Sequence, residues 1–482
     1  MSLGLFATLD MSKRSLDTAR AGIELTGHNL ANISNRAYAR QRLKLETSDA
    51  IATSTGPQGT GAKVAGIEAI RSRLLDNQII IETGVAGYLE AKQKALQFGE
   101  VNLGQRLDGQ ASTPEGAAAA EGVGGQFGIV EGLNEFFSSF QALSTSPNST
   151  ADRQVVLLKT QNLSEKFKSV DTRLARLRQD LNTSVSDDLT EANNLLKQVA
   201  DLSKSITGAE LGGVGNANDL RDRRQQTIEN LAKIINVQTT TNAATNTTDV
   251  TVAGVTMISA NNQVEDLESF TDALGGFQVR TNNRATAATT DLTLTSGSAK
   301  GTIDARDGSI ATLISGIDTL AGTLITAVNT LHTPGFALDG TSTGQDFFTG
   351  TKASDIAINT VLSQDVNLIQ ASADGDAGNN GVALSIAQLE NTTQSTLGSL
   401  TLTESYNQSV ANFGQALHNV NSQSGDQKAV NRLMESQRDS LGGVSVDEEM
   451  ANLVIFQRAF QANAKMISTI DELLQNVLNL TR

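Results

Sequence analysis

The residues that could carry catalysis or bind a metal are few and poorly spaced in this chain. Its three histidines, His28, His332 and His418, lie in separate segments. None belongs to an HExxH or His-x3-His pattern, the spacings that place two imidazoles on one helical face to hold zinc. The 482 residues include no cysteine, which excludes thiolate catalysis, disulfides and cysteine zinc sites. Each histidine is therefore predicted to be an ordinary surface or core residue.

Two segments resemble ligand-binding loops but lack a required residue. Residues 56–61 have the outer glycine spacing of a phosphate-binding loop, yet Ala62 stands where the lysine is needed. Residues 374–385 begin like a calcium-binding loop, but Asn379 replaces its glycine and Ser385 replaces its bidentate glutamate. We interpret the first segment as a plain turn and the second as a solvated loop.

A dinucleotide-binding motif and a catalytic triad are also absent. Gly122 and Gly124 precede a helical pattern, but Phe127 occupies the third glycine position and no strong strand comes before them. Carboxylate pairs are common and undistinguished, and so few histidines support no Ser-His-Asp set. We therefore expect no enzymatic activity, cofactor or metal.

Overall composition narrows the class of protein further. The formal net charge of -15 and the pI near 4.8 disfavour nucleic acid and anionic membrane as partners. Aromatic residues make up 4% and tryptophan is missing, unlike in large compact enzymes. The sequence contains no run of about 18 apolar residues, the length that would predict a membrane span. The first residues also lack the pattern of a secretory signal peptide.

The two ends of the chain carry apolar residues at alternating four- and three-residue spacing. This spacing predicts a helix with one apolar seam, as in a coiled coil. The predicted interface residues of the N-terminal helix are Leu5, Leu9, Leu16, Ile23, Leu30 and Ile33. Those of the C-terminal helix are Val446, Met450, Leu453, Phe460, Ala464, Ile467, Leu474 and Leu478. Because an apolar seam must be covered, the two helices either pair with each other or pack against copies of themselves.

The middle of the chain is predicted to be helical with one β insertion. Residues 163–181 keep strict four-three spacing, and residues 192–206 resume it in a shifted phase, which indicates a coiled-coil stutter or a helical hairpin. From residue 237 the chain is rich in Thr, Asn and Ala with short alternating runs, typical of a small β domain that is half-buried at best. Helical patterns return from residue 307, and residues 383–440 form the last block before the C-terminal helix.

These patterns predict a mainly α, discontinuous multidomain protein. Its terminal helices pair as a projecting stalk, and the β insertion lies at the distal tip. The expected domains are 1–45 and 443–482 (terminal coiled coil), 46–236 and 304–442 (helical domain), and 237–303 (β insertion).

Both ends resemble the bacterial flagellar axial proteins of the rod, the hook and the hook-associated class. In the N-terminal stretch the matching motif residues include Asn29, Asn32, Tyr38, Arg40 and Gln41. His28 and Ala37 depart from the motif, which usually has Asn and Gly at those positions. The C-terminal stretch SVDEEMANLVIFQRAFQANAKMISTIDELLQNVLNL is similar to the closing helix of the same proteins.

The middle of the chain resembles one branch of that group, the FlgK-type hook-associated family of the hook–filament junction. The similarity covers residues 136–237 and residues 301–348, where an RDG segment leads to VNTLHTPGFALDG and then QDFF. The β insertion carries little of it. Rod and hook subunits lack these helical blocks.

The resemblance implies a structural role in the flagellum and no catalysis. Many copies would form a ring whose terminal helices build concentric tubes, with the β domain outermost. Export through the flagellar type III apparatus would suit the missing signal peptide and cysteines. The implied partners are other copies of the chain, the hook protein, the second junction protein and a FlgN-like export chaperone, and the implied location is the extracellular flagellum.

Two other interpretations of the sequence stay open. One is a different axial subunit of the hook or distal rod, against which the long helical middle argues. The other is a secreted adhesin or effector on a coiled-coil stalk, with the β insertion as its binding head.

Overall fold

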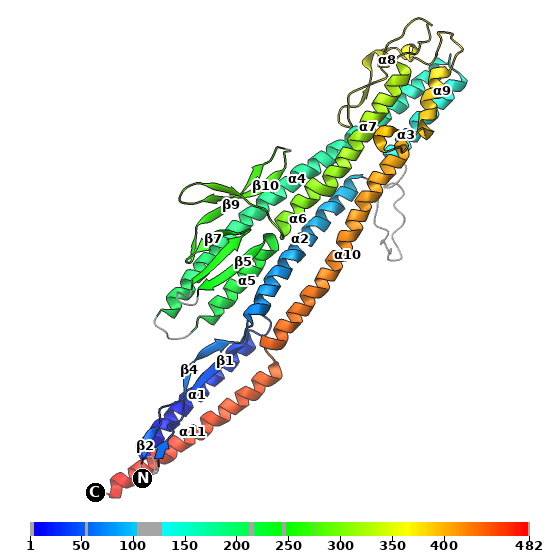
Figure 1. Ribbon diagram of the computed structural model, residues 1–482. Coiled ribbons are helices and arrows are strands. Elements are labelled where there is room, and N and C mark those ends of the chain that lie inside the picture. Colours follow the sequence, from blue (N-terminus) through cyan, green and yellow to red (C-terminus); the bar gives the residue numbers. More distant parts are fainter. Residues whose placement is uncertain are drawn as a thin grey trace.

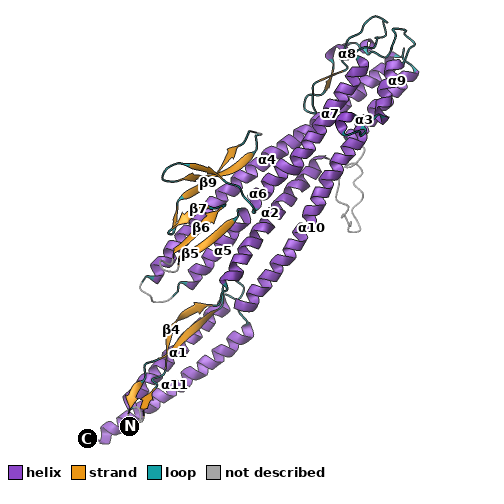
Figure 2. Ribbon diagram, viewed as in Figure 1, coloured by secondary structure: helices purple, strands orange, loops and turns teal. Residues whose placement is uncertain are grey.

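The molecule is a long rod with both chain ends at one tip (Figure 1). The computed structural model describes residues 4–53, 56–103, 128–211, 216–242, 247–273 and 275–480. The two terminal helices, α1 (Leu5–Ala31) and α11 (Val446–Leu480), form the lower part of the rod. The other long helices make up the body, and most strands lie along its side (Figure 2).

Long helices form the body, and the strands are short. The remaining helices are α2 (Arg73–Leu103), α3 (Ile129–Thr145), α4 (Thr150–Glu210), α5 (Asn218–Ile234), α6 (Ser298–Asp304), a π-helical turn (Ala305–Ile310), α7 (Ala311–His332), α8 (Thr360–Gln364), α9 (Gly381–Gln388) and α10 (Leu402–Gly442). The strands are β1 (Gln41–Thr47), β2 (Ile51–Thr53), β3 (Gly56–Gln58), β4 (Ala62–Ala69), β5 (Val237–Asn242), β6 (Thr247–Val252), β7 (Val255–Ser259), β8 (Asn262–Gln263), β9 (Glu265–Thr271), β10 (Phe277–Asn283), β11 (Thr289–Asp291), β12 (Phe348–Thr349) and β13 (Ala357–Ile358).

Helix α4 is one unbroken helix of 61 residues, so the helical-hairpin alternative is wrong. At 1.5 Å per residue it is about 90 Å long. Its buried positions step from Leu181 to Val185, Leu189 and Ala192, which inserts an extra four-residue step into the four-three pattern. Such a stutter rotates the apolar face gradually, so the two halves of α4 face different partners.

Those two halves belong to two separate hydrophobic cores. The upper core joins the first half of α4 to α3, α7, α9 and α10, around the edge-packed rings of Phe136, Phe140, Phe347 and Phe348. The centroids of Phe136 and Phe140 lie 5.1 Å apart, a favourable aromatic distance. The lower core joins the second half of α4 to α5, α6 and the β insertion.

The β insertion packs sideways on α4 and not at the distal tip, which corrects the prediction (Figure 1). It consists of a four-stranded antiparallel sheet, β5-β6-β7-β8, and a three-stranded sheet, β11-β10-β9. Val250, Met257 and Ile258 are fully buried, so the insertion is also better buried than its composition suggests. The reason is that these side chains complete the lower core, which α4 and α5 alone would leave open.

Polar contacts from α4 fix the insertion in place. The Asn193 side chain donates to the Leu267 carbonyl and accepts from its N–H, both at 2.8 Å, so it mimics a neighbouring strand. Asn182 accepts from the fully buried Arg306 at 2.7 Å and from the Phe277 N–H at 3.3 Å. The π-helical turn that carries Arg306 is therefore tied to both α4 and β10.

Residues 41–53 and 56–69 form a two-stranded ribbon beside α1. β1 and β4 pair antiparallel from Gln41↔Ala69 to Thr47↔Ala62, and the short pair β2–β3 extends the ribbon. Gly61 lies against the Met11 side chain of α1. Residues 46–69 thus accompany the terminal helices, although the predicted boundaries assign them to the helical domain. We call α1, α11 and this ribbon the stalk.

The distal end of the body is capped by loops and short helices between residues 333 and 401. The predicted helical block 383–440 is interrupted there, because residues 389–401 form turns before Thr401 caps α10. The cap packs on His332, which is fully buried. The His332 Nδ1 lies 2.7 Å from the Gln345 carbonyl oxygen, and its Nε2 accepts from the Gln370 N–H at 2.9 Å. These two partners hold a neutral ring that carries its proton on Nδ1.

One helical run, Ser298–His332, is long and apolar enough to cross a membrane by length and composition alone. Its apolar residues Leu313, Ile317, Leu320 and Leu324 are buried against the neighbouring helices of the upper core. Core helices pass the same test, and the packing shows that this run is one.

Replacing a glycine by alanine should destabilise the body only where that glycine touches the backbone of another helix. A Cβ at Gly87 of α2 would collide with the Lys233 carbonyl of α5, whereas a Cβ at Gly208 of α4 would meet nothing within 4 Å. We expect Gly87→Ala to destabilise the body by about 1–3 kcal/mol through overpacking. Gly208→Ala should stabilise it by about 0.5–1 kcal/mol. Urea unfolding followed by circular dichroism measures both, and equal effects would contradict the proposed close contact.

Acidification should weaken the distal cap through His332. Burial lowers the pKa of His332 to about 4, while an unfolded histidine titrates near 6.5. Between these values the unfolded chain binds a proton that the folded chain does not. Stability should therefore fall as the pH decreases from about 6.5 to about 4, by at most about 3 kcal/mol. Urea unfolding of wild type and His332→Gln across this range provides the test, because the variant should lose this part of the pH dependence. An unchanged dependence would count against it.

Candidate assembly interface

The two terminal helices pair with each other in antiparallel orientation, with one constant register. The Ser12 hydroxyl donates to the Met466 sulfur at 3.0 Å, Gly22 lies under the Phe456 ring, and the Asn29 amide donates to Glu449 at 3.2 Å. In each of these three pairs the residue numbers add up to 478. The packing is therefore continuous from the bottom of the stalk to the place where it meets the body.

On α1 the line of closest contact is made of small and polar residues. Ser12, Ala19, Gly22, Thr26 and Asn29 are buried there. Gly22 has no Cβ, which lets the Phe456 ring lie directly on the helix backbone. The predicted four-three pattern also passed through Ser12, Ala19 and Thr26, and these three are buried in the contact. Elsewhere the contact runs through Gly22 and Asn29, one residue before the predicted Ile23 and Leu30.

The predicted interface residues of α1 lie on the flank of this contact. Leu5, Leu9, Leu16, Ile23 and Leu30 are half-buried, and Ile33 is 40% exposed. We call the first five of these residues the leucine stripe.

On α11 the predicted residues divide into two groups. Five of them are half-buried: Leu453, Phe460, Ala464, Ile467 and Leu474. Two residues outside the predicted set are buried, namely Glu449, which precedes these five, and Ile470, which lies among them. Val446, Met450 and Leu478 are exposed, with 67% of Leu478 accessible. In the register of 478, Leu478 lies beyond the level of Leu5, the first residue of α1.

Asn29 is the centre of a buried hydrogen-bond network at the top of the stalk. Its Oδ1 accepts from the Tyr38 hydroxyl at 2.6 Å and from the Gln41 N–H at 3.1 Å. Its Nδ2 donates to the Gln41 carbonyl at 3.0 Å and to Glu449 at 3.2 Å. Burial and the nearby carboxylates of Asp219, Asp222 and Glu449 raise the pKa of Tyr38 far above its usual value. The phenol therefore stays protonated and remains a donor.

Arg40 supplies the positive charge that the buried Glu449 needs. Its Nε donates to Glu449 at 2.7 Å, and its Nη1 donates to Glu448 at 2.6 Å. Glu449 is 2% exposed, and an unpaired buried carboxylate would be strongly destabilising. Asn32 has a different and local role, because its side chain donates to the His28 carbonyl at the end of α1.

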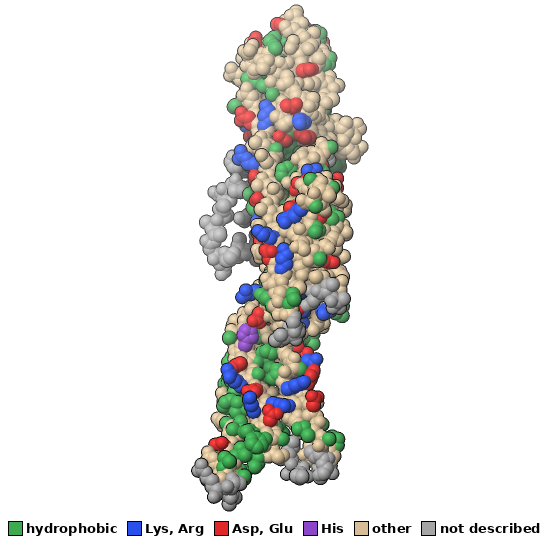
Figure 3. Space-filling view, turned by 90° about the vertical axis from the view of Figure 1, so that its left-hand side faces the viewer, with side chains coloured by type: hydrophobic (Ala, Val, Ile, Leu, Met, Phe, Trp, Pro, Cys, Tyr) green, Lys and Arg blue, Asp and Glu red, His purple; other side chains and the backbone are tan. Residues whose placement is uncertain are grey.

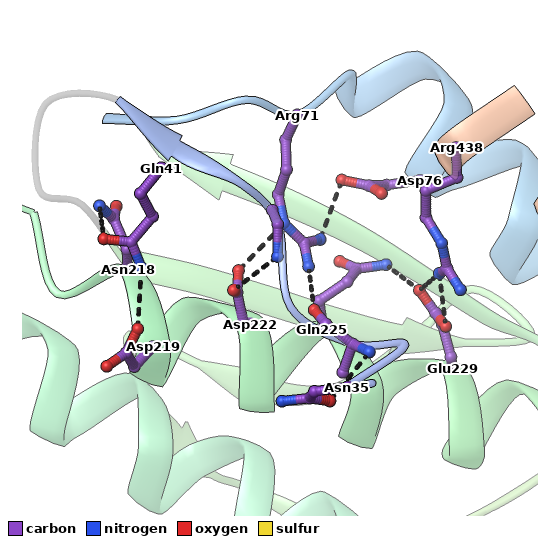
Figure 4. Close-up of polar contacts among 12 residues, drawn as sticks. Asn35, Gln41, Arg71, Asp76, Asn218, Asp219, Asp222, Gln225, Glu229 and Arg438 are labelled. Carbon is purple, nitrogen blue, oxygen red and sulfur yellow. Dashed lines mark hydrogen bonds and ion pairs between the residues drawn. The ribbon is translucent and has the colours of Figure 1, made fainter. Parts of the chain in front are cut away.

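Two aspartates in the first turns of α5 attach the stalk to the body (Figure 4). Asp219 accepts from the Gln41 side chain at 2.9 Å and lies 3.3 Å from the His28 ring. Asp222 accepts from the Ala39 N–H at 3.0 Å and from Arg71 at 3.1 Å. Burial raises the pKa of Asp222, and the charge of Arg71 opposes that shift.

Sequence reasoning missed Asp219 and Asp222. The available signal was two carboxylates spaced three apart at a helix start, where the helix dipole favours them. That signal does not reveal that their partners Gln41 and Ala39 lie about 180 residues earlier in the chain.

The three chain crossings between stalk and body are also joined to one another. The Arg40 N–H donates to the Gly442 carbonyl at 2.9 Å, and its carbonyl accepts from the Ile70 N–H at 2.8 Å. On the body side Arg438 pairs with Glu229 at 3.2 Å. The stalk is thus held at a defined angle by backbone and side-chain bonds together.

The segments that resembled ligand loops have structural roles where they are described. Residues 56–58 pair with β2 in the ribbon. Asp374 accepts from the Asp376 N–H at 3.0 Å and from Asn379 at 2.8 Å, and these bonds lower its pKa. Gly122, Gly124 and Phe127 lie outside the described residues. Within the described ranges, no three His, Asp or Glu side chains are grouped to hold a metal.

Comparison with known proteins gives a consistent result for body and stalk. The family model for the helical domain of flagellar hook-associated protein FlgK matches residues 123–348. A model for the C-terminal region of the flagellar basal body rod proteins FlgEFG matches residues 441–480.

These matches support a FlgK-type flagellar hook-associated protein.

Relatives of this family are similar over nearly their whole length. Flagellar hook-associated protein 1 of Bacillus subtilis is 26% identical, with 98% of each chain covered. The protein of the same name from Escherichia coli is 22% identical and covers 96% of this chain. The solved structure of the flagellar hook junction protein FlgK from Burkholderia pseudomallei superposes with a TM-score of 0.63 at 14% identity, over 77% of this chain and all of that one. This last similarity concerns the fold.

Removing Asn29 should loosen the stalk more than removing Asn32, although both belong to the family motif. Asn29→Ala removes the partner of the Tyr38 hydroxyl and of the Gln41 backbone, and one of the two partners of Glu449, and we expect a loss of about 2 kcal/mol or more. Asn32→Ala removes one local bond and should cost under about 1 kcal/mol. Hydrogen exchange of the two variants should show faster exchange in α1 and α11 for Asn29→Ala only, with α4 unchanged. Equal exchange in the two variants would refute the central role of Asn29.

Proposed function

We propose that this chain is a structural subunit of the junction between flagellar hook and filament and assembles through its stalk. Similarity to the FlgK-type family supports the structural role, since the relatives are hook-associated proteins. The observation that carries the assembly role is the apolar surface left on the stalk after α1 and α11 have paired. The exposed fractions of Val446, Met450 and Leu478 are 47%, 46% and 67%.

Such a surface is expected to be covered by other copies of the chain. Apolar surface of this extent on one part of a molecule marks an interaction site. The leucine stripe and the exposed apolar residues of α11 are spread along the stalk. Many stalks packed in parallel would form a tube and bury these residues. We assign the predicted interface residues of both helices to this contact.

The proposed neighbours follow from the position of a junction. Hook protein would lie on one side and the second junction protein on the other, and a FlgN-like chaperone would cover the C-terminal helix before type III export. The polar network of Asn29, Arg40 and Glu449 suits this role because it fixes the stalk relative to the body before assembly. The β insertion, held on the side of α4, would face outward.

Electron microscopy of a strain that lacks the gene tests the proposed function. A junction subunit predicts hooks that end without filaments, and restoration of filaments by the wild-type gene. Normal filaments in the deletion strain would disprove it. An adhesin would instead leave filaments intact and lose only surface binding.

A charge on the stalk should block assembly without unfolding the body. Phe460 is half-buried on α11, and the neighbouring Gln461 is exposed. Phe460→Asp should prevent incorporation at the hook tip, because a carboxylate cannot be buried there without a partner. Gln461→Asp should assemble normally. Both variants should keep the wild-type unfolding transition of the body, since its two cores do not include α11. Filament growth in cells carrying only Phe460→Asp would overturn the assignment.

A further inference from the structure

The stalk carries two apolar surfaces that are only partly covered and that differ in structure. One is the leucine stripe on α1, whose residues are half-buried. The other is on the ribbon, where Leu45 is 49% exposed, Ile51 48%, and Val64 and Ile67 37% each. Figure 3 shows hydrophobic side chains gathered over the lower part of the stalk, among rows of charged ones.

The ribbon presents its apolar residues as a matched set. Leu43 pairs across the strands with Ile67, and Leu45 pairs with Val64. The alternate positions carry charge, including the Arg42–Glu68 ion pair at 2.6 Å. A two-stranded ribbon is marginally stable by itself, and most of its residues remain accessible although it borders α1. It therefore gains most from a further apolar partner.

At the level of Met11 the two surfaces lie on nearly opposite sides of α1. The ribbon reaches α1 at Met11, on which Gly61 rests. Leu9 precedes Met11 by two residues, and two residues correspond to about 200° around a helix. Around this level the ribbon of a chain therefore cannot cover the leucine stripe of the same chain.

The ribbon lies at the same height as the larger part of the leucine stripe. The ribbon contacts α1 from Met11, at Gly61, to Asn29, which bonds Gln41 opposite Ala69. From residue 61 to residue 69 a strand rises about 26 Å. From residue 11 to residue 29 a helix rises about 27 Å. The leucine stripe spans the same part of α1.

We infer that the ribbon of one copy packs on the leucine stripe of the next copy at the same height. This inference rests on the proposed function and names the surfaces of its lateral contact. The occupant is a second copy because one chain carries both complementary surfaces, on opposite sides and at matched height. Two different surfaces joined in this way form a head-to-tail contact, which closes into a ring when the rotation permits. The contact is also continuous with the α1–α11 interface. Residues of α1 and α11 lie at the same level when their numbers add up to 478, so Phe460 and Ile467 lie level with residues 18 and 11.

Engineered cysteines test this contact cleanly, because the chain has none of its own. A disulfide needs Cα atoms within about 7 Å, and the width of α1, about 10 Å, separates the two surfaces within one chain. The test variant carries Leu16→Cys with Val64→Cys. The matched control carries Asp17→Cys with Val64→Cys, which moves one cysteine about 100° around α1 at nearly the same height. A second test pair, Ile23→Cys with Ile67→Cys, samples a higher level and covers the case in which the first pair fails to assemble.

The measurement is oxidation of purified hook–filament preparations from strains that carry each variant, followed by non-reducing electrophoresis. We expect dimers and higher covalent multimers of the chain with either test pair and none with the control. Intact filaments without multimers, or cross-links only to another protein such as an export chaperone, would overturn the inference and leave the proposed function standing. Failure of the proposed function would appear separately, as normal filaments in the deletion strain.

Discussion

The structure depends on covering two apolar helices that begin and end the chain. Neither helix can be stable in water alone with its apolar side exposed, and each is the nearest partner for the other. Their antiparallel contact has one register over its whole length, from Ser12–Met466 to Asn29–Glu449. Because the two ends must meet, the chain between residues 70 and 442 has to leave the stalk and return to it. The rod-like shape is the consequence.

The place where the chain leaves and returns is held by polar contacts, and this has a physical reason. Apolar packing permits sliding and rotation, whereas Asn29, Tyr38, Arg40 and Glu449 satisfy one another in a single arrangement. Asp219 and Asp222 extend this specificity to the body through α5. A subunit that assembles through its stalk needs a defined angle between stalk and body, since an error in that angle would displace the distal end of the body by many ångströms.

The body uses one long helix to connect two different cores. The stutter in α4 turns its apolar face from the phenylalanine cluster toward the β insertion, so a single element organises both halves. The insertion is consequently a part of the body core and not an appendage, and Asn193 and Arg306 fix its position. Apolar surface remains on the stalk, where α1 and α11 cover only part of their apolar residues.

The sequence by itself determined the mainly helical class, the terminal helices, the β insertion and the family, because these depend on local periodicity and on motif residues close together in the chain. It also identified Asn29, Tyr38, Arg40 and Gln41, but not what they touch. Only the tertiary structure decided that small residues such as Gly22 form the contact line of α1, that the ribbon joins the stalk, that α4 is unbroken, and that the insertion lies along the side. Those features depend on which surfaces meet across hundreds of residues. Periodicity shows that a side chain is apolar and on one face, but the partner that approaches most closely is chosen by shape and by the balance of buried charges, such as Arg40 with Glu449.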